Sequence, residues 1–160
     1  MAKHEKPGRS DEWYTPPHVF EALDCRFDMD VAYPWAAEPE VPADRFLCRD
    51  SLQAEWSGFV WMNPPFGRRN GLKPWLDKFF THGNGIALTP DRTSCPWWQE
   101  AAGKSAAVLF WAPKIHFIPG PGVVATSPAQ GTTLFAVGFK GIDALKRAAD
   151  LGRGVYMEPK

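Results

Sequence analysis

The sequence contains few residues of the kinds that bind metals or form disulfides, and these few are not clustered. Its 3 cysteines and 4 histidines are scattered along 160 residues, and none of them stands in a metal-spaced pair. A zinc site or another metal centre is therefore not expected. An odd, dispersed set of cysteines instead indicates reduced thiols, so we expect a cytoplasmic protein.

The chain also lacks a net charge and a long apolar run. Its 18 Lys and Arg balance 18 Asp and Glu, which gives a formal net charge of zero at pH 7. Any binding of nucleic acid must then depend on a local basic patch and not on a global field. No stretch is apolar enough to span a membrane or to act as a secretion signal. We expect residues 1–10 to be a loose polar tail and residues 11–160 to form a single domain.

Segments with the patterns of strands and helices alternate along the chain. Apolar runs bounded by turn residues predict strands over residues 27–32, 58–62, 85–89, 106–111 and 132–139. Apolar residues at helical spacing predict helices over residues 18–23, 73–80, 95–102 and 142–149. Residues 33–46 and 119–131 are proline-rich and are predicted to be irregular loops. The alternation predicts an α/β fold with a mostly parallel sheet and helices on both faces, with most of the 8 tryptophans in the core.

Polar side chains stand at or after the ends of several predicted strands. Asp30, Asp50 and Asn63 each end or follow such a segment. Ligands of open α/β sheets bind at the carboxyl ends of the strands. The pattern therefore predicts that these residues share one binding site.

The tetrapeptide Asn63-Pro64-Pro65-Phe66 is the most informative motif of the chain. Consecutive prolines fix the backbone and remove two N–H donors, so the carbonyls of Asn63 and Pro64 are held rigid without ladder partners. An amide side chain, a fixed carbonyl and an aromatic ring can together accept hydrogen bonds from a planar exocyclic amine and stack on its ring. A stiff turn that only terminates the strand is the alternative interpretation of the same residues.

The tetrapeptide resembles the Asn/Asp-Pro-Pro-Phe/Tyr motif of amino-group N-methyltransferases, which use S-adenosylmethionine. Residues 11–17, 27–32, 50–52 and 56–58 precede it in an order similar to that of the small phage-type, Dam-like DNA N6-adenine methyltransferases. The resemblance spans residues 11–139. It implies a reduced Rossmann-like methyltransferase sandwich, in which the segment 132–139 would be the C-terminal antiparallel strand of the sheet.

The resemblance also implies a cofactor site for S-adenosylmethionine, with S-adenosylhomocysteine as the product. Asp30 would pair with the cofactor's ammonium group, and Asp50 would accept a hydrogen bond from its adenine amino group or ribose. The remaining predicted cofactor contacts are Tyr14, Thr15, Pro16, Asp28 and Asn63. In the alternative interpretation, Asp28 and Asp30 face solvent on an edge strand and Asp50 is a capping or turn residue. The chain lacks the glycine-rich turn that many such enzymes carry after the first strand.

Catalysis and DNA binding are predicted around the same tetrapeptide. Asn63 and the Pro64 carbonyl would accept the two N–H groups of adenine N6, with Pro65 fixing the turn, while Phe66 stacks on a base flipped out of the duplex or taken from a single strand. The cations predicted to contact phosphates are Arg68, Arg69, Lys73 and Arg92. A solvated loop is the alternative for the first three.

The resemblance implies a phage or prophage protein that acts on DNA in a bacterial host. Because 160 residues leave little room for a separate recognition domain, we expect a short or relaxed target sequence, or a homodimer with a larger reading surface. Other amino-group substrates stay open, namely cytosine N4, RNA adenine and the glutamine amide of a protein. The missing glycine-rich turn favours one further alternative, a nucleic-acid-binding module without catalytic activity.

Overall fold

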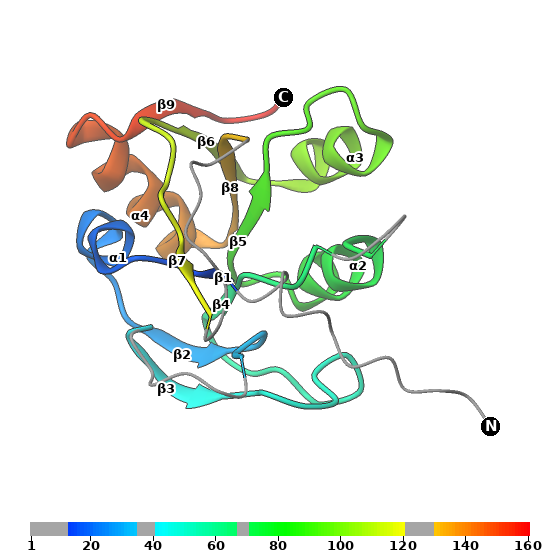
Figure 1. Cartoon of the computed structure of the whole chain (residues 1–160). Coiled ribbons are helices and arrows are strands. Elements are labelled where there is room, and N and C mark those ends of the chain that lie inside the picture. The colour runs from blue at the N-terminus through cyan, green and yellow to red at the C-terminus, as the bar shows by residue number, and fades with distance from the viewer. Residues whose placement is uncertain (1–12, 35–40, 67–70, 121–129) are drawn as a thin grey trace.

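A seven-stranded mixed sheet forms the centre of the computed structural model, which describes residues 13–34, 41–66, 71–120 and 130–160 (Figure 1). The expected tail over residues 1–10 and both Arg68 and Arg69 lie outside the described residues. In their order across the sheet, the strands are β3 (Ala43–Phe46), β2 (Phe27–Asp30), β4 (Val60–Met62), β5 (Gly85–Pro90), β8 (Thr132–Val137), β6 (Ala107–Trp111) and β9 (Gly154–Met157).

The pairings in one half of the sheet are parallel, and those in the other half are antiparallel. Strands β3, β2, β4 and β5 are parallel, whereas β8 is antiparallel to both β5 and β6. Because both β5 and β6 oppose β8, β6 runs in the same direction as β5. The edge where β2, β3, β4, β5 and β6 end is called the carboxyl edge below, and it is where α/β sheets bind their ligands.

The predicted α/β class and the antiparallel strand are confirmed, but the position of that strand differs from the prediction. Strand β8 lies inside the sheet between β5 and β6 and ends at Val137 instead of residue 139. It ends there because Gly138 adopts a positive φ of 86° and turns the chain into a helix. The edge position is held by β9, which pairs antiparallel with β6 and was not predicted.

Helices cover both faces of the sheet (Figure 1). On one side lie α1 (Pro17–Leu23) and α4 (Phe139–Asp150), and on the other lie α2 (Lys73–His82) and α3 (Pro96–Lys104). All four predicted helices are thus confirmed, with ends that shift by at most three residues. The first three carry a proline in the first turn, where its fixed φ favours helix initiation and its missing N–H leaves no bond unmade.

Two apolar clusters fill the space between the sheet and its helices. Phe20, Trp61 and Leu145 belong to the cluster beneath α1 and α4, and Phe79 and Phe135 to the cluster beneath α2 and α3. The tryptophans that are buried are Trp56, Trp61, Trp98 and Trp111, which confirms the expected core role for these four. None of the helices in the described part of the chain is long and apolar enough to cross a membrane.

Besides β9, three short elements were not predicted. Strand β3 lies within the proline-rich segment that was expected to be an irregular loop, although residues 35–40 of that segment are outside the described part. Strands β1 (Trp13–Tyr14) and β7 (Ile118–Pro119) form a separate antiparallel pair, with Trp13 opposite Pro119. Most of the loop expected over residues 119–131 also lies outside the description. The β1–β7 pair fixes the N-terminal segment against the chain that follows β6.

Candidate active site

Asp30 and Asn63 lie at the carboxyl edge of two neighbouring strands. Asp30 is the last residue of β2, and its register partner on β4 is Trp61. Asn63 follows Met62, the last residue of β4. The structure therefore brings these two predicted site residues to adjacent strand ends, as the positions of the predicted strands implied.

The tetrapeptide that begins at Asn63 leaves the sheet abruptly. Since Pro64 and Pro65 have no N–H groups, β4 cannot extend its hydrogen-bond ladder through them. Pro64 is buried, whereas Pro65 and Phe66 are exposed, and 40% of the Phe66 surface is accessible. The turn thus has a rigid buried base and presents an aromatic ring at the surface.

The side-chain amide of Asn63 is held by the segment around β1. Its Nδ2 donates to Thr15 Oγ1 at 3.1 Å and lies 3.5 Å from the carbonyl oxygen of Trp13. Thr15 is buried, with 5% of its surface accessible. Two segments that are 48 residues apart in sequence therefore meet at this amide. Thr15 was predicted as a cofactor contact, and the structure adds a direct bond to Asn63.

Asp30 is a buried carboxyl group, with 3% of its surface accessible. Burial raises the pKa of Asp30 to about 7, and the hydrogen bond that Oδ1 accepts from Ala32 N at 3.0 Å opposes this shift only in part. The alternative of a solvent-facing residue on an edge strand is wrong for Asp30, because β2 lies between β3 and β4. Asp30 is thus a buried carboxyl group at the carboxyl edge of the sheet.

Asp28 is placed apart from the other predicted site residues. Its Oδ2 accepts a hydrogen bond from the backbone N–H of Phe59 at 2.7 Å, near the start of β4 and away from the carboxyl edge. The backbone N–H of Asp28 donates in turn to the Phe59 carbonyl at 2.8 Å. This geometry gives Asp28 a structural role in joining β2 to β4, which differs from the cofactor contact that the sequence suggested.

Asp50 begins a tight turn that is attached to the end of β2. It adopts a positive φ of 50°, which is uncommon for a residue with a side chain, and its carbonyl accepts from Gln53 N and Ala54 N at 2.9 Å each. The hydroxyl of Ser51 donates to the carbonyl of Val31, the residue after Asp30. The turn interpretation of Asp50 is therefore confirmed, and this turn presents an exposed carboxylate beside the end of β2.

Lys78 stabilises the same turn, and sequence reasoning missed it. Its Nζ donates to the carbonyls of Ser51 at 3.1 Å, Leu52 at 3.0 Å and Ala54, and it lies over the Trp56 ring. A lysine on a helix carries no pattern that identifies carbonyl partners more than 20 residues away, so no sequence signal could have found it.

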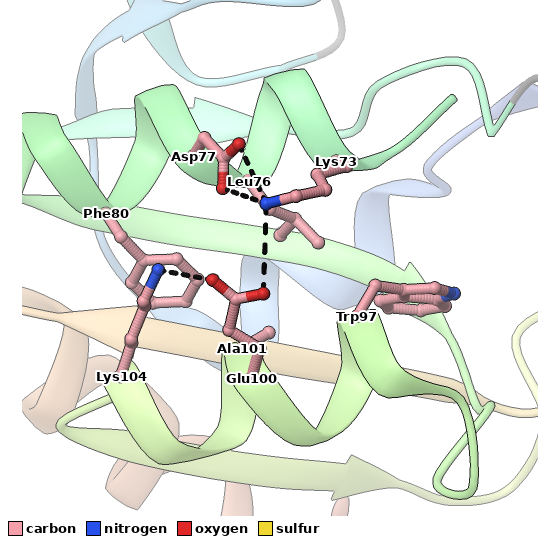
Figure 2. A pocket seen from close by; sticks show the side chains of 8 residues that line it. All are labelled: Lys73, Leu76, Asp77, Phe80, Trp97, Glu100, Ala101 and Lys104. Carbon is pink, nitrogen blue, oxygen red and sulfur yellow. Dashed lines mark hydrogen bonds and ion pairs between the residues drawn. The ribbon is translucent and has the colours of Figure 1, made fainter. Parts of the chain in front are cut away.

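The predicted DNA-binding cations occupy different environments. Lys73 Nζ lies 2.9 Å from Asp77 Oδ1 and 3.8 Å from Glu100 Oε2, in a groove between α2 and α3 (Figure 2). The hydrogen bond to Asp77 is the main cause of its raised pKa. Arg92 follows β5 at the carboxyl edge and is exposed, as is Lys114, which follows β6. The charge of Lys73 is thus balanced locally, whereas Arg92 and Lys114 are exposed residues that follow strands ending at the carboxyl edge.

The groove between α2 and α3 does not contain the candidate site. Its lining residues are Lys73, Leu76, Asp77, Phe80, Trp97, Glu100, Ala101 and Lys104. Figure 2 shows that Glu100 bridges it, with bonds to Lys104 at 2.6 Å and to Lys73. Across the described ranges, no three His, Cys, Asp or Glu side chains are grouped so that they could hold a metal ion.

A mixed α/β sheet with an Asn-Pro-Pro-Phe turn at the end of a central strand is consistent with a Rossmann-like methyltransferase. The chain belongs to the family described as DNA N-6-adenine-methyltransferase (Dam), whose model matches residues 2–137. It is 30% identical over 109 residues to the DNA N-6-adenine-methyltransferase of Escherichia phage T1. That match covers 63% of this chain and 44% of the phage protein, which is less than half of the relative's length. No solved structure matches the chain.

Proposed function

We propose that this protein transfers a methyl group from S-adenosylmethionine to the N6 amino group of adenine in DNA. The observation that carries the proposal is the common location of Asn63, Phe66 and Asp30 at the ends of the neighbouring strands β2 and β4. Asn63 would accept from the target amine, Phe66 would stack on the target base, and Asp30 would pair with the cofactor's ammonium group. Membership of the adenine-specific DNA methyltransferase family supports the same reaction.

Asn63 and Pro64 would act on the amino group of the target base. The lone pair of adenine N6 is delocalised into the ring, which makes the nitrogen a poor nucleophile. Acceptance of its two N–H groups by Asn63 Oδ1 and the Pro64 carbonyl would favour a pyramidal nitrogen and direct the lone pair. Positioning of this kind contributes up to ~7–11 kcal/mol. No strong base is needed beforehand, because the nitrogen becomes acidic as it is alkylated.

The residues around Asp30 fit the amino-acid end of the cofactor. The described chain places no cation on the Asp30 carboxyl, which is buried and has a pKa of about 7, so a bound ammonium group would favour its ionised form. Asp50, presented by its turn, would accept from the ribose or the adenine amino group. Tyr14 and Pro16, on either side of Thr15, would line the amino-acid end of the cofactor. When bound, the cofactor supplies an electrophilic sulfonium methyl group.

DNA would approach the carboxyl edge from the side of Phe66. The N6 group is hidden in a duplex, so the base must be flipped out or the strand must be single. The Phe66 ring would stack on the extruded base, worth ~1–3 kcal/mol. Arg92 and Lys114 would contact phosphates, together with Arg68 and Arg69, which follow the tetrapeptide in sequence. A short or relaxed target sequence, read by one chain or by a homodimer, is part of the same proposal.

Nucleoside mass spectrometry tests the reaction directly. The purified protein is incubated with S-adenosylmethionine and either DNA or RNA, and the digested nucleosides are analysed. We expect N6-methyladenine in the DNA, and we expect Asn63→Ala to lower the rate at least about 100-fold, the loss seen when a transition-state hydrogen-bonding group is removed. Calorimetry should show nearly unchanged cofactor binding. N4-methylcytosine, methylated RNA or cofactor binding without any product would each contradict the proposal.

A further inference from the structure

The orientation of the Asn63 amide decides whether this residue can accept a hydrogen bond from an amino group. A side-chain amide has an oxygen that accepts and a nitrogen that donates, and rotation by half a turn exchanges them. Only the orientation with Oδ1 toward the substrate can bind the N–H of an adenine amine. With Nδ2 in that place, two donors would face each other.

The Trp13 carbonyl distinguishes the two orientations, whereas the Thr15 hydroxyl can bond to either amide atom. The backbone carbonyl of Trp13 can only accept, so the amide atom that faces it at 3.5 Å must be Nδ2. Thr15 Oγ1 takes the second N–H of Nδ2 at 3.1 Å. Both donors are thereby directed to the segment around β1. Among the described residues, none donates to Oδ1.

The segment that holds the amide is itself constrained. Trp13 is paired with Pro119 in the β1–β7 ladder, and a proline has no N–H to offer. Thr15 is buried, and Pro16, which follows it, is the N-cap of α1. On the other side, Pro64 restricts Asn63 to an extended backbone. The backbone positions of the acceptors and of Asn63 are therefore fixed by β1, α1 and the proline turn, and the amide orientation depends on its hydrogen bonds.

We propose that Thr15, together with the Trp13 carbonyl, fixes the amide of Asn63 with Oδ1 toward the substrate, which makes Thr15 a positioning residue. This inference rests on the proposed methyl transfer and assigns Thr15 a role distinct from the predicted cofactor contact. The flipped amide would set Oδ1 against the Trp13 carbonyl, acceptor against acceptor. The N-terminal segment thus determines whether Asn63, 48 positions further along the chain, can accept a hydrogen bond from the substrate.

Substitution of Thr15 tests the proposal with a matched control. Thr15→Val keeps the shape and removes the acceptor, whereas Thr15→Ser keeps the acceptor. Thr89→Val makes the same change at another buried threonine, whose Oγ1 has no partner among the described residues. We expect Thr15→Val to lower the single-turnover rate about tenfold, the equivalent of one hydrogen bond. Thr15→Ser should restore most of the rate, and Thr89→Val should leave it unchanged.

Two outcomes of the kinetics would overturn the role. A wild-type rate in Thr15→Val would show that the amide needs no orientation by Thr15. A loss of cofactor affinity that accounts for the whole loss of rate would make Thr15 a cofactor contact instead. Circular dichroism and thermal unfolding of each variant would show whether the substitution lowers activity by destabilising the fold. In that case, Thr15→Ser and Thr15→Val would differ in stability and not in rate per folded molecule.

A measurement without substrate separates this proposal from the proposed reaction. In nitrogen-15 NMR spectra, the side-chain NH₂ of Asn63, assigned from its absence in Asn63→Ala, should exchange slowly with solvent in the wild-type protein. The exchange should accelerate in Thr15→Val but not in Thr89→Val. Fast exchange in the wild type would contradict the fixed amide, whatever the activity. Slow exchange in a protein that methylates nothing would leave the amide orientation supported and the proposed function refuted.

Discussion

The carboxylate of Asp28 accepts a hydrogen bond from the backbone N–H of Phe59, with 2.7 Å between Oδ2 and N. This hydrogen bond joins β2 to Phe59, the residue that lies between Gly58 and the start of β4. Gly58 has a positive φ of 74°, and a Cβ at this position would overlap the Asp28 carboxylate. A glycine is therefore required for close approach of the two strands. Asp28 thus joins β2 to β4 near the start of β4, and the same two strands carry Asp30 and Asn63 at their carboxyl ends.

We predict that Asp28→Ala destabilises the protein without weakening cofactor binding. The substitution leaves the Phe59 N–H without its acceptor, which costs ~1–3 kcal/mol for a buried donor. The free energy of unfolding, from urea titration, should fall by that amount, while calorimetry should give an unchanged cofactor affinity per folded molecule. Asp44→Ala is the control, because Asp44 makes an exposed ion pair with Arg26 that should be worth less than ~1 kcal/mol. A specific loss of cofactor affinity in Asp28→Ala would restore the role suggested by the sequence.

Asp30 should make the stability of the unliganded protein fall as the pH rises. Its pKa of about 7 in the folded state exceeds the value of 3.8 that applies to an unfolded chain. Between these values the folded protein retains a proton that the unfolded chain has lost, so the stability present below pH 3.8 is lost by about pH 7. Asp30→Asn stays neutral and removes this dependence. In thermal unfolding, the variant should be more stable than wild type at pH 8 and nearly equal to it at the acid end.

The same substitution should weaken cofactor binding, because the neutral amide cannot pair with an ammonium group. In the wild type, binding below pH 7 should release a proton from Asp30, and calorimetry in buffers of different ionisation enthalpy would measure it. Equal affinity for Asp30→Asn and wild type, with no proton release, would show that the cofactor binds elsewhere.

Phe66→Ala should weaken productive DNA binding by ~1–3 kcal/mol through the loss of base stacking, and Phe66→Trp should preserve part of it. Because 40% of the Phe66 surface is accessible, the fold should tolerate the change. Phe139→Ala is the matched control, since Phe139 is 88% exposed at the start of α4 and is not part of the carboxyl edge. Fluorescence anisotropy with labelled DNA would give both affinities. If Phe66→Ala unfolds the protein instead, the stacking role is wrong.

The salt dependence of DNA affinity should identify the cations that contact phosphates. Each contact contributes about 0.9 to the slope of log affinity against log salt concentration. Arg92→Ala and Lys114→Ala should each flatten the slope by about that amount, similarly for different DNA sequences. Lys73→Ala should change it less, because Lys73 is already paired with Asp77 and Glu100. A larger effect of Lys73 than of Arg92 would place the DNA over α2.

The main elements of the fold could be predicted because their patterns are long enough to have a period. The helix α4 and the strand β8 each show apolar spacing over many residues, and both were found, although β8 ends two residues earlier and α4 begins three residues earlier than predicted. β1 and β7 have only two residues each, too few for a period of two to be visible. β3 has a single fully buried residue, Ala43, and its pairing with β2 is decided by the neighbouring strand and not by its own sequence.

The candidate site was predictable where it depends on strand ends and not where it depends on side-chain partners. Asp30 and Asn63 each end or follow an apolar run, and parallel strands end at one edge, so their proximity follows from the pattern. Asp28 and Asp30 are two residues apart on one strand, and periodicity cannot separate them. Their roles differ because Asp28 lies beside the start of β4, whereas Asp30 lies beside its end. The bond between Thr15 and Asn63 depends on tertiary structure alone.

The central position of β8 determines when the sheet can be completed during synthesis. β5 and β6 precede β8 in the chain, yet neither has the other as a neighbour, and β8 must enter between them. In a nascent chain that ends after β6, the strands β5 and β6 therefore lack the strand that lies between them. Only β8, which ends at Val137, can fill this position. Pairings between distant segments form late and slowly. Folding of the whole sheet, including the edge that carries Asn63, must consequently wait until most of the chain has left the ribosome.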